Sequence, residues 1–333
     1  MRSPNAQGRA VPGLLPALIL FWVGTAAAFG AAVELSFQEN PAATGWRRLG
    51  DPDLFVWDKE AGVLRAKWDS SRPNSAFYLP LGRTLTRAES FAVECELIFE
   101  EIRAGADPAK PFSFELAMGF FSAADLADPD FRRGDGVSVR NLAELDFFPD
   151  AGYGPTLWPM AISSEGRFNY NSPEDFVILE LPLKEPLTLR LEYDAEAQSL
   201  VASVRRGGDW LLAPHRTPLA ESFGDFRVDA AGLCSYSDAG AGGSLFAAAL
   251  VRRLRVETPE PPVRELRLEF AGKRPRLCFQ AAGGWRYALE RSVDLLRWEE
   301  TASAVVEEAG AAALEDSAPP ERKAFYRIRA ERQ

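Results

Sequence analysis

Apolar and polar residues alternate with a period of two through most of this chain. Such alternation places successive side chains on opposite faces of an extended strand, and the apolar face must be buried against a second layer. We find no long stretch with the period of an amphipathic helix, and only residues 122–130 have a composition suited to a short one. The clearest strand segments are 62–69, 75–81, 91–102, 112–121, 142–148, 187–193, 200–205, 226–236 and 245–256. The sequence therefore predicts an all-β protein.

The strand pattern divides the chain into two parts. About ten strands between residues 31 and 257, joined by turns, favour a two-sheet jelly-roll sandwich. Within it, 187–193 and 200–205 are typical of a hairpin. The alternation stops at residues 258–262, a Pro-rich acidic stretch that we interpret as a semi-rigid linker. The period of two returns over 263–333 and predicts a small second β domain, since 333 residues suffice for two buried cores.

Residues 1–30 have the features of a secretory signal peptide. Arg2 and Arg9 precede an apolar run over 14–23, and small residues follow at 24–28. The run is shorter than the ~20 residues that a spanning helix needs, although an uncleaved N-terminal anchor remains the alternative. We therefore expect an exported protein in the periplasm, at the cell surface or outside the cell. No transmembrane segment is expected in the mature chain.

The charge balance excludes some classes of function. The chain has 38 Lys and Arg against 48 Asp and Glu, a formal net charge of −10. Nucleic-acid binding needs concentrated positive charge, so no nucleic-acid partner is expected. A single histidine, His215, excludes sites built from several histidines, and its proline-flanked position predicts an exposed loop. We expect a monomer.

The three cysteines do not form an obvious disulfide framework. Cys95, Cys234 and Cys278 are an odd number without close spacing. Cys95 shares the apolar face of the 91–102 segment, which predicts a small core residue. Export would permit a bridge between Cys95 and Cys234, and the disulfide state of all three stays open.

Several stretches carry a resemblance to known families. They are FVWD at 55–58, WDSSRPNS at 68–75 and ELDFFPDAGYG at 144–154. With these, residues 33–257 resemble the concanavalin A-like lectin/glucanase superfamily, in a secreted bacterial branch. The tail, through YALERS at 287–292, DLLRW at 294–298 and FYRI at 325–328, is similar to small fibronectin-like β domains of exported bacterial proteins. The resemblance implies a concave sheet that binds glycans, followed by a spacer or attachment module.

Candidate site residues follow from strand alternation. Glu144 and Asp146 share one face of the 142–148 segment, opposite core-facing neighbours. If the 112–121 segment lies beside it in the concave sheet, Glu115 joins them there. Arg190, with Glu192, lies on the polar face of the 187–193 segment. Carboxylates accept hydrogen bonds from sugar hydroxyls.

Aromatic side chains extend the candidate glycan site. Tyr153 and Trp158, with Trp68 as a further candidate, could stack on sugar rings. Together with the acidic residues and Arg190 they make up the predicted ligand-binding set, whose partner would be a polysaccharide or a cell-surface glycan.

Three interpretations of this set stay open. Glycan binding without hydrolysis is the leading one. A β-glucanase-like hydrolase would use Glu144, Asp146 and Glu115, but superfamily hydrolases have a second glutamate shortly after the Glu-x-Asp pair, where this chain has Phe148 and Pro149. The third is a solvated, charge-balanced outer face on a purely structural or protein-binding module. A groove carpeted by Arg–Glu pairs or closed by loops would favour that third interpretation.

No cofactor is expected, with structural calcium as the one alternative. Acidic residues could supply oxygen ligands at two places, although aspartates in loops more often form turns and caps. The two sets are Asp51, Asp53 and Asp58, and Asp125, Asp128 and Asp130.

Overall fold

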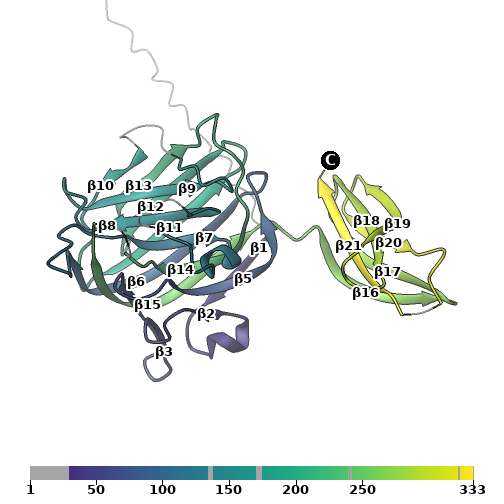
Figure 1. Ribbon diagram of the computed structural model, residues 1–333, viewed down its shortest axis with the longest axis horizontal. Helices are drawn as coiled ribbons and strands as arrows, with labels where there is room; N and C mark the ends of the chain where they lie inside the picture. Colours follow the sequence, from purple (N-terminus) through teal and green to yellow (C-terminus); the bar gives the residue numbers. More distant parts are fainter. Residues whose placement is uncertain are drawn as a thin grey trace, which may run out of the picture.

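The computed structural model describes residues 30–133, 138–169, 175–238, 240, 242–321 and 323–332. The predicted signal peptide lies outside the described residues, except for Gly30. The fold is all-β, as predicted, and Figure 1 shows two bodies of strands between which the chain passes once. Among the described residues, no helix is long and apolar enough to cross a membrane.

One sheet of the larger body has β15 at its centre, which pairs antiparallel with β6 on one side and with β4 and β1 on the other. In spatial order its described strands are β13 (Asp209–Pro218), β12 (Ser199–Arg206), β11 (Pro186–Asp194), β6 (Phe91–Ala104), β15 (Leu245–Thr258), β4 (Val63–Asp69) and β3 (Phe55–Asp58), with β1 (Ala31–Leu35) beside the end of β15. We call this the first sheet. The predicted hairpin is confirmed as β11 and β12.

The second sheet faces the first and is also antiparallel throughout its described strands. Its strands in spatial order are β10 (Val177–Ile178), β9 (Thr156–Ile162), β8 (Leu142–Phe148), β7 (Leu116–Phe121), β14 (Val228–Ser235), β5 (Ser75–Leu85) and β2 (Arg47–Leu49). The predicted two-sheet sandwich is therefore confirmed.

The core of the sandwich is built by the alternation seen in the sequence. On β6 the residues Phe91, Val93, Cys95, Leu97 and Phe99 are all buried, whereas Glu94 and Glu96 on the opposite face are not. Cys95 thus acts as a small core residue, as predicted. It is a free thiol and so is Cys234, which overturns the alternative of a bridge between them.

The short helix predicted at 122–130 is smaller in the structure. α1 spans Ala123–Leu126 and begins at Ser122, whose hydroxyl oxygen accepts a hydrogen bond from the Asp125 N–H at 3.2 Å. It ends early because Asp128 precedes Pro129, and a residue before proline avoids the helical conformation. A single 3₁₀ turn, η1, spans Pro41–Thr44.

Two expectations about single residues are wrong. His215 lies on β13, not in a loop, because Pro214 and Pro218 are tolerated on an edge strand. Trp68 cannot stack on a sugar, because it is 2% exposed and packs in the core against Phe55.

The smaller body has its own hydrophobic cluster, formed by Leu277, Phe279, Tyr287 and their neighbours between two antiparallel sheets. In spatial order the described strands are β16 (Val263–Ala271), β17 (Arg274–Ala281) and β20 (Gly310–Glu315) in one sheet. The other sheet contains β19 (Glu299–Val306), β18 (Trp285–Ser292) and β21 (Phe325–Arg332). Tyr287 ties this body to the segment before it, because its hydroxyl donates to the carbonyl oxygen of Pro262 at 2.8 Å.

Candidate functional site

The predicted acidic cluster forms because β7 and β8 are neighbours in the second sheet. Gly119 lies opposite Glu144, and Ala117 lies opposite Asp146. A Cβ atom at Gly119 would come within 2.3 Å of the Ala143 carbonyl oxygen, so only glycine permits this close approach of the strands. Because directly opposite residues share a face, small residues on β7 leave room beside the two carboxylates.

The burial of these carboxylates was not expected. Glu115, Glu144 and Asp146 are 3%, 1% and 0% exposed. The interpretation of Glu144 and Asp146 as part of a solvated outer face is therefore wrong. Both faces of β7 and β8 are covered, one by the core of the sandwich and the other by side chains from outside these strands.

Arg133 and Tyr236 provide most of that cover. The Nη2 atom of Arg133 lies 2.5 Å from Oδ2 of Asp146, and its Nε lies 3.5 Å from Oε1 of Glu115. The Tyr236 hydroxyl donates a hydrogen bond to Oε1 of Glu144 at 2.5 Å. Arg133 comes from the segment between α1 and β8, and Tyr236 follows the end of β14.

Apolar groups complete the cover. The rings of Phe131 and Tyr236 stack with centroids 6.0 Å apart, and the Arg133 guanidinium lies 5.8 Å from the centre of the Phe168 ring. The sulfur of Met160 lies 3.0 Å from Nη2 of Arg133. The cluster is thus an enclosed polar site within an apolar layer.

This enclosure shifts the pKa values of the acids. Burial, and then the charge of Asp146, raise the pKa of Glu144 to about 8. Burial also raises the pKa of Glu115 to about 7, against the opposing effect of Arg133. Burial raises the pKa of Asp146 as well, against the opposing effect of its short contact with Arg133. All three carboxylates therefore have raised pKa values, because burial outweighs the attraction of Arg133.

This arrangement differs from the one that retaining hydrolysis uses. Retaining hydrolysis needs two carboxylates about 5–5.5 Å apart on either side of an accessible sugar. Here Arg133 and Tyr236 occupy the side of the sheet from which a sugar would approach Glu144 and Asp146. The side-chain atoms Oε2 of Glu144 and Oδ1 of Asp146 are buried without a hydrogen-bond partner among the described residues.

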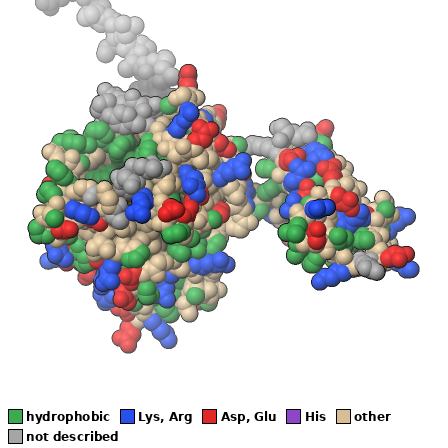
Figure 2. Space-filling model, in the orientation of Figure 1, with side chains coloured by type: hydrophobic (Ala, Val, Ile, Leu, Met, Phe, Trp, Pro, Cys, Tyr) green, Lys and Arg blue, Asp and Glu red, His purple; other side chains and the backbone are tan. Residues whose placement is uncertain are grey.

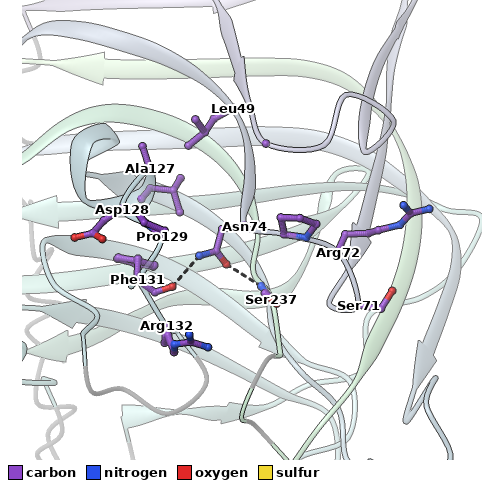
Figure 3. A pocket seen from close by; sticks show the side chains of 13 residues that line it. Leu49, Ser71, Arg72, Asn74, Ala127, Asp128, Pro129, Phe131, Arg132 and Ser237 are labelled. Atoms are coloured by element: carbon purple, nitrogen blue, oxygen red, sulfur yellow. Dashed lines mark hydrogen bonds between the residues drawn. The ribbon is translucent and has the colours of Figure 1, made fainter.

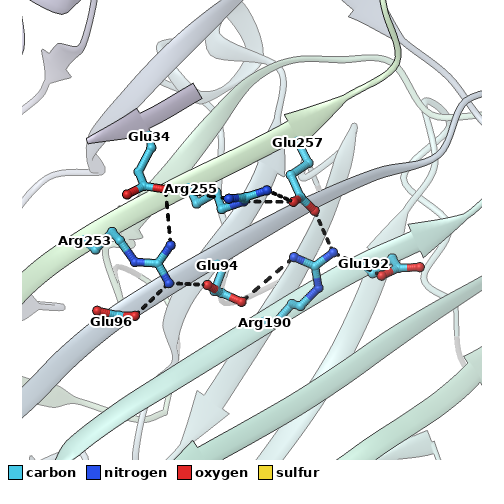
Figure 4. A network of polar contacts seen from close by, with 8 residues as sticks. All are labelled: Glu34, Glu94, Glu96, Arg190, Glu192, Arg253, Arg255 and Glu257. Atoms are coloured by element: carbon cyan, nitrogen blue, oxygen red, sulfur yellow. Dashed lines mark hydrogen bonds and ion pairs between the residues drawn. The ribbon is translucent and has the colours of Figure 1, made fainter. Parts of the chain in front are cut away.

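Arg190 does not belong to this cluster. It lies on β11 in the first sheet, where Nη2 is 2.7 Å from Glu257 and 3.2 Å from Glu192. Figure 4 shows it in a network of arginines and glutamates on the outer face of that sheet. The network contains Glu34, Glu94, Glu96, Arg190, Glu192, Arg253, Arg255 and Glu257. The expectation that Arg190 shares a site with Glu144 and Asp146 is wrong.

The predicted aromatic residues lie at the edge of the second sheet. Trp158 on β9 is opposite Asp146 and therefore on the same face. Its ring centre is 6.1 Å from that of Phe176, which is 5.5 Å from that of Tyr153. Tyr153 is 58% exposed, whereas Trp158 is half-buried. Of the predicted ligand-binding set, Tyr153 is the member that a glycan could reach directly.

The acidic residues proposed for calcium have other roles. The Asp51 carboxylate accepts the Asp53 N–H at 2.9 Å, and Asp58 pairs with Arg65 at 2.8 Å. Across the parts of the chain that the structure describes, no group of three acidic, histidine or cysteine side chains is arranged to hold a metal ion. In the second proposed set, Asp125 pairs with Arg140 at 2.7 Å.

A groove of about 560 Å³ lies close to the buried cluster, at the meeting point of four segments. Figure 3 shows its lining, which comes from the end of β2, the β4–β5 connection, the segment after α1 and the residue after Tyr236. Asn74 holds these segments together. Its side-chain amide donates to the Phe131 carbonyl oxygen at 2.9 Å and accepts from the Ser237 N–H at 2.8 Å.

The groove combines two kinds of lining. Leu49, Leu126 and Phe131 give it an apolar wall, and polar side chains supply hydrogen-bond donors and acceptors. The polar side chains are Ser71, Arg72, Asn74, Asp128, Arg132 and Ser237. Figure 2 shows that charges of both signs are mixed on the face it draws. The groove is therefore suited to a ligand with both hydroxyl groups and apolar faces.

Comparison with known proteins gives matches in structure. A scan against models of protein families finds no match, and a search of curated proteins finds none either. The chain is similar to peanut lectin with a nine-residue peptide, at 12% identity and a TM-score of 0.45, covering 68% of this chain and 97% of the lectin.

Two further solved structures give the same result. The lectin UEA-II in complex with galactose is 12% identical, with a TM-score of 0.41 over 68% of this chain and 99% of that one. Lectin I from Ulex europaeus, in complex with the methyl glycoside of α-L-fucose, is 13% identical, with a TM-score of 0.40 over 69% of this chain and 98% of that one. At these identities the likeness concerns the fold and assigns no ligand.

Arg133, Tyr236 and the groove were not predicted from the sequence. Arg133 lies in a polar stretch without strand alternation, so no local pattern marks it as buried. A usable signal exists for Tyr236, which continues the apolar pattern of the 226–236 segment. The groove joins residues as distant as Leu49 and Ser237, and sequence spacing carries no signal for it.

Proposed function

We propose that this chain is an exported protein that binds carbohydrate without cleaving it, in the groove between β2, α1 and the end of β14. The observation that carries the proposal is the groove itself. Its volume of about 560 Å³ lies within the range of ligand pockets, roughly 300–1,000 Å³. Its apolar wall suits the apolar face of a sugar ring, and its polar side chains suit the hydroxyl groups at the edge of the ring.

The rigidity of the groove supports the same proposal. Asn74 fixes two of the lining segments through hydrogen bonds of 2.9 and 2.8 Å, so little ordering is needed when a ligand binds. The exposed side chains of Arg132 and Arg72 supply donors, and Asp128 supplies an acceptor. Tyr153 would offer a separate stacking surface at the far edge of the sheet.

The test is electrophoresis of the mature chain in native gels that contain neutral or acidic polysaccharides. We expect retardation on at least one polymer, and a loss of most of that retardation in Arg132→Ala. The matched control Arg206→Ala, an exposed arginine on the first sheet, should behave as the wild type. Unchanged mobility on every polymer overturns carbohydrate binding. Retardation that Tyr153→Ala abolishes and Arg132→Ala does not would overturn the groove as the site.

The absence of cleavage is tested separately. We expect no release of reducing sugar from any polymer that binds. Release by the wild type that is lost in Glu144→Gln would show that the buried carboxylates become accessible, and would replace this proposal with the hydrolase.

A second candidate, a purely structural or protein-binding module, is favoured by one observation. The face of β7 and β8 that was expected to bind glycans is closed by Arg133 and Tyr236. Export itself rests on residues 1–30 and is tested by N-terminal sequencing of the secreted protein, which we expect to begin near residue 31.

A further inference from the structure

The edge strand β16 has an apolar stripe that nothing described in the chain covers. Leu266, Leu268 and Phe270 are 50%, 54% and 67% exposed. Leu268 lies opposite Leu277, a buried residue of the small core, so its side chain is on the inner face of its sheet. The second sheet of this body, β19-β18-β21, covers Leu277 but leaves the stripe exposed.

The backbone of β16 also has a free edge. Phe270 lies opposite Pro275, which has no N–H, and the Pro275 carbonyl oxygen accepts the Asp316 N–H at 3.0 Å on the β20 side. Phe270 and Pro275 are therefore a pair without hydrogen bonds between them. Because such pairs alternate with bonded ones, the N–H and C=O groups of Phe270 and Leu268 point away from β17 and towards solvent. Between Arg264 and Arg267 the register with β17 shifts, and Glu265 has a φ of 51°, so this alternation holds for Leu268 and Phe270 and not for Leu266.

Charges on the opposite face of β16 are arranged in a self-complementary order. Arg267 and Glu269 flank Leu268 on the outer face, and Arg267 is 70% exposed. If a second β16 pairs antiparallel about a twofold axis at Leu268, each Arg267 lies opposite the Glu269 of the other copy. In the same register Leu266 lies opposite Phe270, so apolar residues also meet apolar residues.

Backbone and side chains select one register. A twofold axis at Leu268 makes the Leu268 pair hydrogen-bonded, which matches the backbone groups of Leu268 that point outwards. An axis at Arg267 or at Glu269 would place like charges opposite each other, which destabilises a sheet. Of these three registers, only the one at Leu268 satisfies both conditions.

We propose that β16 is a self-association surface, and that two copies of this chain join through it as an antiparallel, twofold-symmetric pair centred on Leu268. The pairing extends each three-stranded sheet into a continuous one and places both apolar stripes on the same side. An unprotected edge strand with an apolar face is otherwise a site of uncontrolled aggregation. This inference differs from the monomer expected from the sequence and does not rest on carbohydrate binding.

The test exploits the charge order. Sedimentation velocity of the full mature chain over a concentration series up to about 200 µM should show a monomer–dimer equilibrium. Arg267→Glu and Glu269→Arg alone each create two like-charge contacts and should weaken the dimer by about tenfold or more. A mixture of the two single variants should associate again, because every facing pair is then opposite in charge. The double variant should also dimerise.

The control is Arg252→Glu, which makes the same charge change on β15 of the larger body and should dimerise as the wild type. Thermal unfolding of each variant checks that it is folded. A wild-type chain that stays monomeric across the series overturns the proposal. Single variants that dimerise as the wild type, or a mixture that does not regain association, overturn the Leu268 register and with it this surface.

Discussion

Two groups of arginines and carboxylates lie on the larger body, and they differ in what surrounds them. Behind β7 and β8, Arg133 lies among three buried acids. Burial and the charge of Asp146 raise the pKa of Glu144 to about 8. On the outer face of the first sheet, Arg190 and Arg255 both bind Glu257. Burial would raise the pKa of Glu257, but the hydrogen bonds from the two arginines outweigh it and lower the pKa.

The comparison shows that hydrogen bonds from cationic partners can reverse the effect of burial on the pKa of a carboxylate. Glu257 is also largely buried, at 7% exposure, yet it receives hydrogen bonds of 2.7 and 2.8 Å from two guanidinium groups. Glu144 receives one from the neutral Tyr236 and lies beside another acid. Burial alone therefore does not make a carboxylate neutral.

The largest expected difference between the two groups follows from removing one arginine. Arg133→Met leaves three acids buried without a cation and should reduce the free energy of unfolding by about 3–5 kcal/mol. Arg253→Met in the outer network should cost about 1 kcal/mol or less, because its partners Glu94 and Glu96 stay in contact with water. Urea denaturation at pH 7 measures both. Equal losses of stability in the two variants would show that burial of the cluster behind β7 and β8 does not increase the cost of removing its arginine.

A smaller effect is expected in the pH dependence of stability. The folded pKa of Glu144 lies above its ordinary value of 4.5, so its contribution is fully present below pH 4.5 and is lost as the pH rises towards 8. Between pH 5 and pH 8, the free energy of unfolding should fall by about 2–4 kcal/mol less in Glu144→Gln than in the wild type. Denaturation at several pH values measures this, with Glu221→Gln, an exposed loop residue, as control. A variant with the wild-type slope would contradict the raised pKa.

The smallest effect is expected for Glu257, with the opposite sign. Its folded pKa is lowered, so its contribution is present above pH 4.5 and is lost as the pH falls through the folded value. Glu257→Gln should reduce the free energy of unfolding by about 0.5–1 kcal/mol at pH 7 and by less at pH 3. The same denaturation series measures it. A loss that grows at low pH would show that the arginine contacts do not control this group.

Much of the fold could be predicted because strand alternation is a local property. The bounds of β8 match the predicted segment, and Cys95 is a core residue as its neighbours on β6 indicated. The β11–β12 hairpin was predicted for the same reason, since its two apolar faces and its turn lie within 20 residues. Short strands such as β2 and β10 were missed because three or two residues hold no measurable period.

The candidate site could be predicted only in part. The meeting of the three acids could be predicted because β7 and β8 are neighbouring strands. The acids are Glu115, Glu144 and Asp146. The position of Arg190 in the other sheet could not be predicted. Alternation assigns a residue to a face of its strand and says nothing about which sheet the strand joins. The side chain that pairs with Asp146 is that of Arg133. It lies in a connection without any periodic pattern.

The sequence by itself determined the all-β class, the apolar core faces of the longer strands and the bounds of β8, because these depend on contacts between near neighbours along the chain. Only the tertiary structure decided that the acids beside β7 are buried, that a groove joins Leu49 to Ser237, and that the stripe on β16 is left without a covering sheet. Each of these depends on which distant segment covers a given strand face. A strand with one apolar face carries the same pattern whether its other face meets water, an arginine or a second chain.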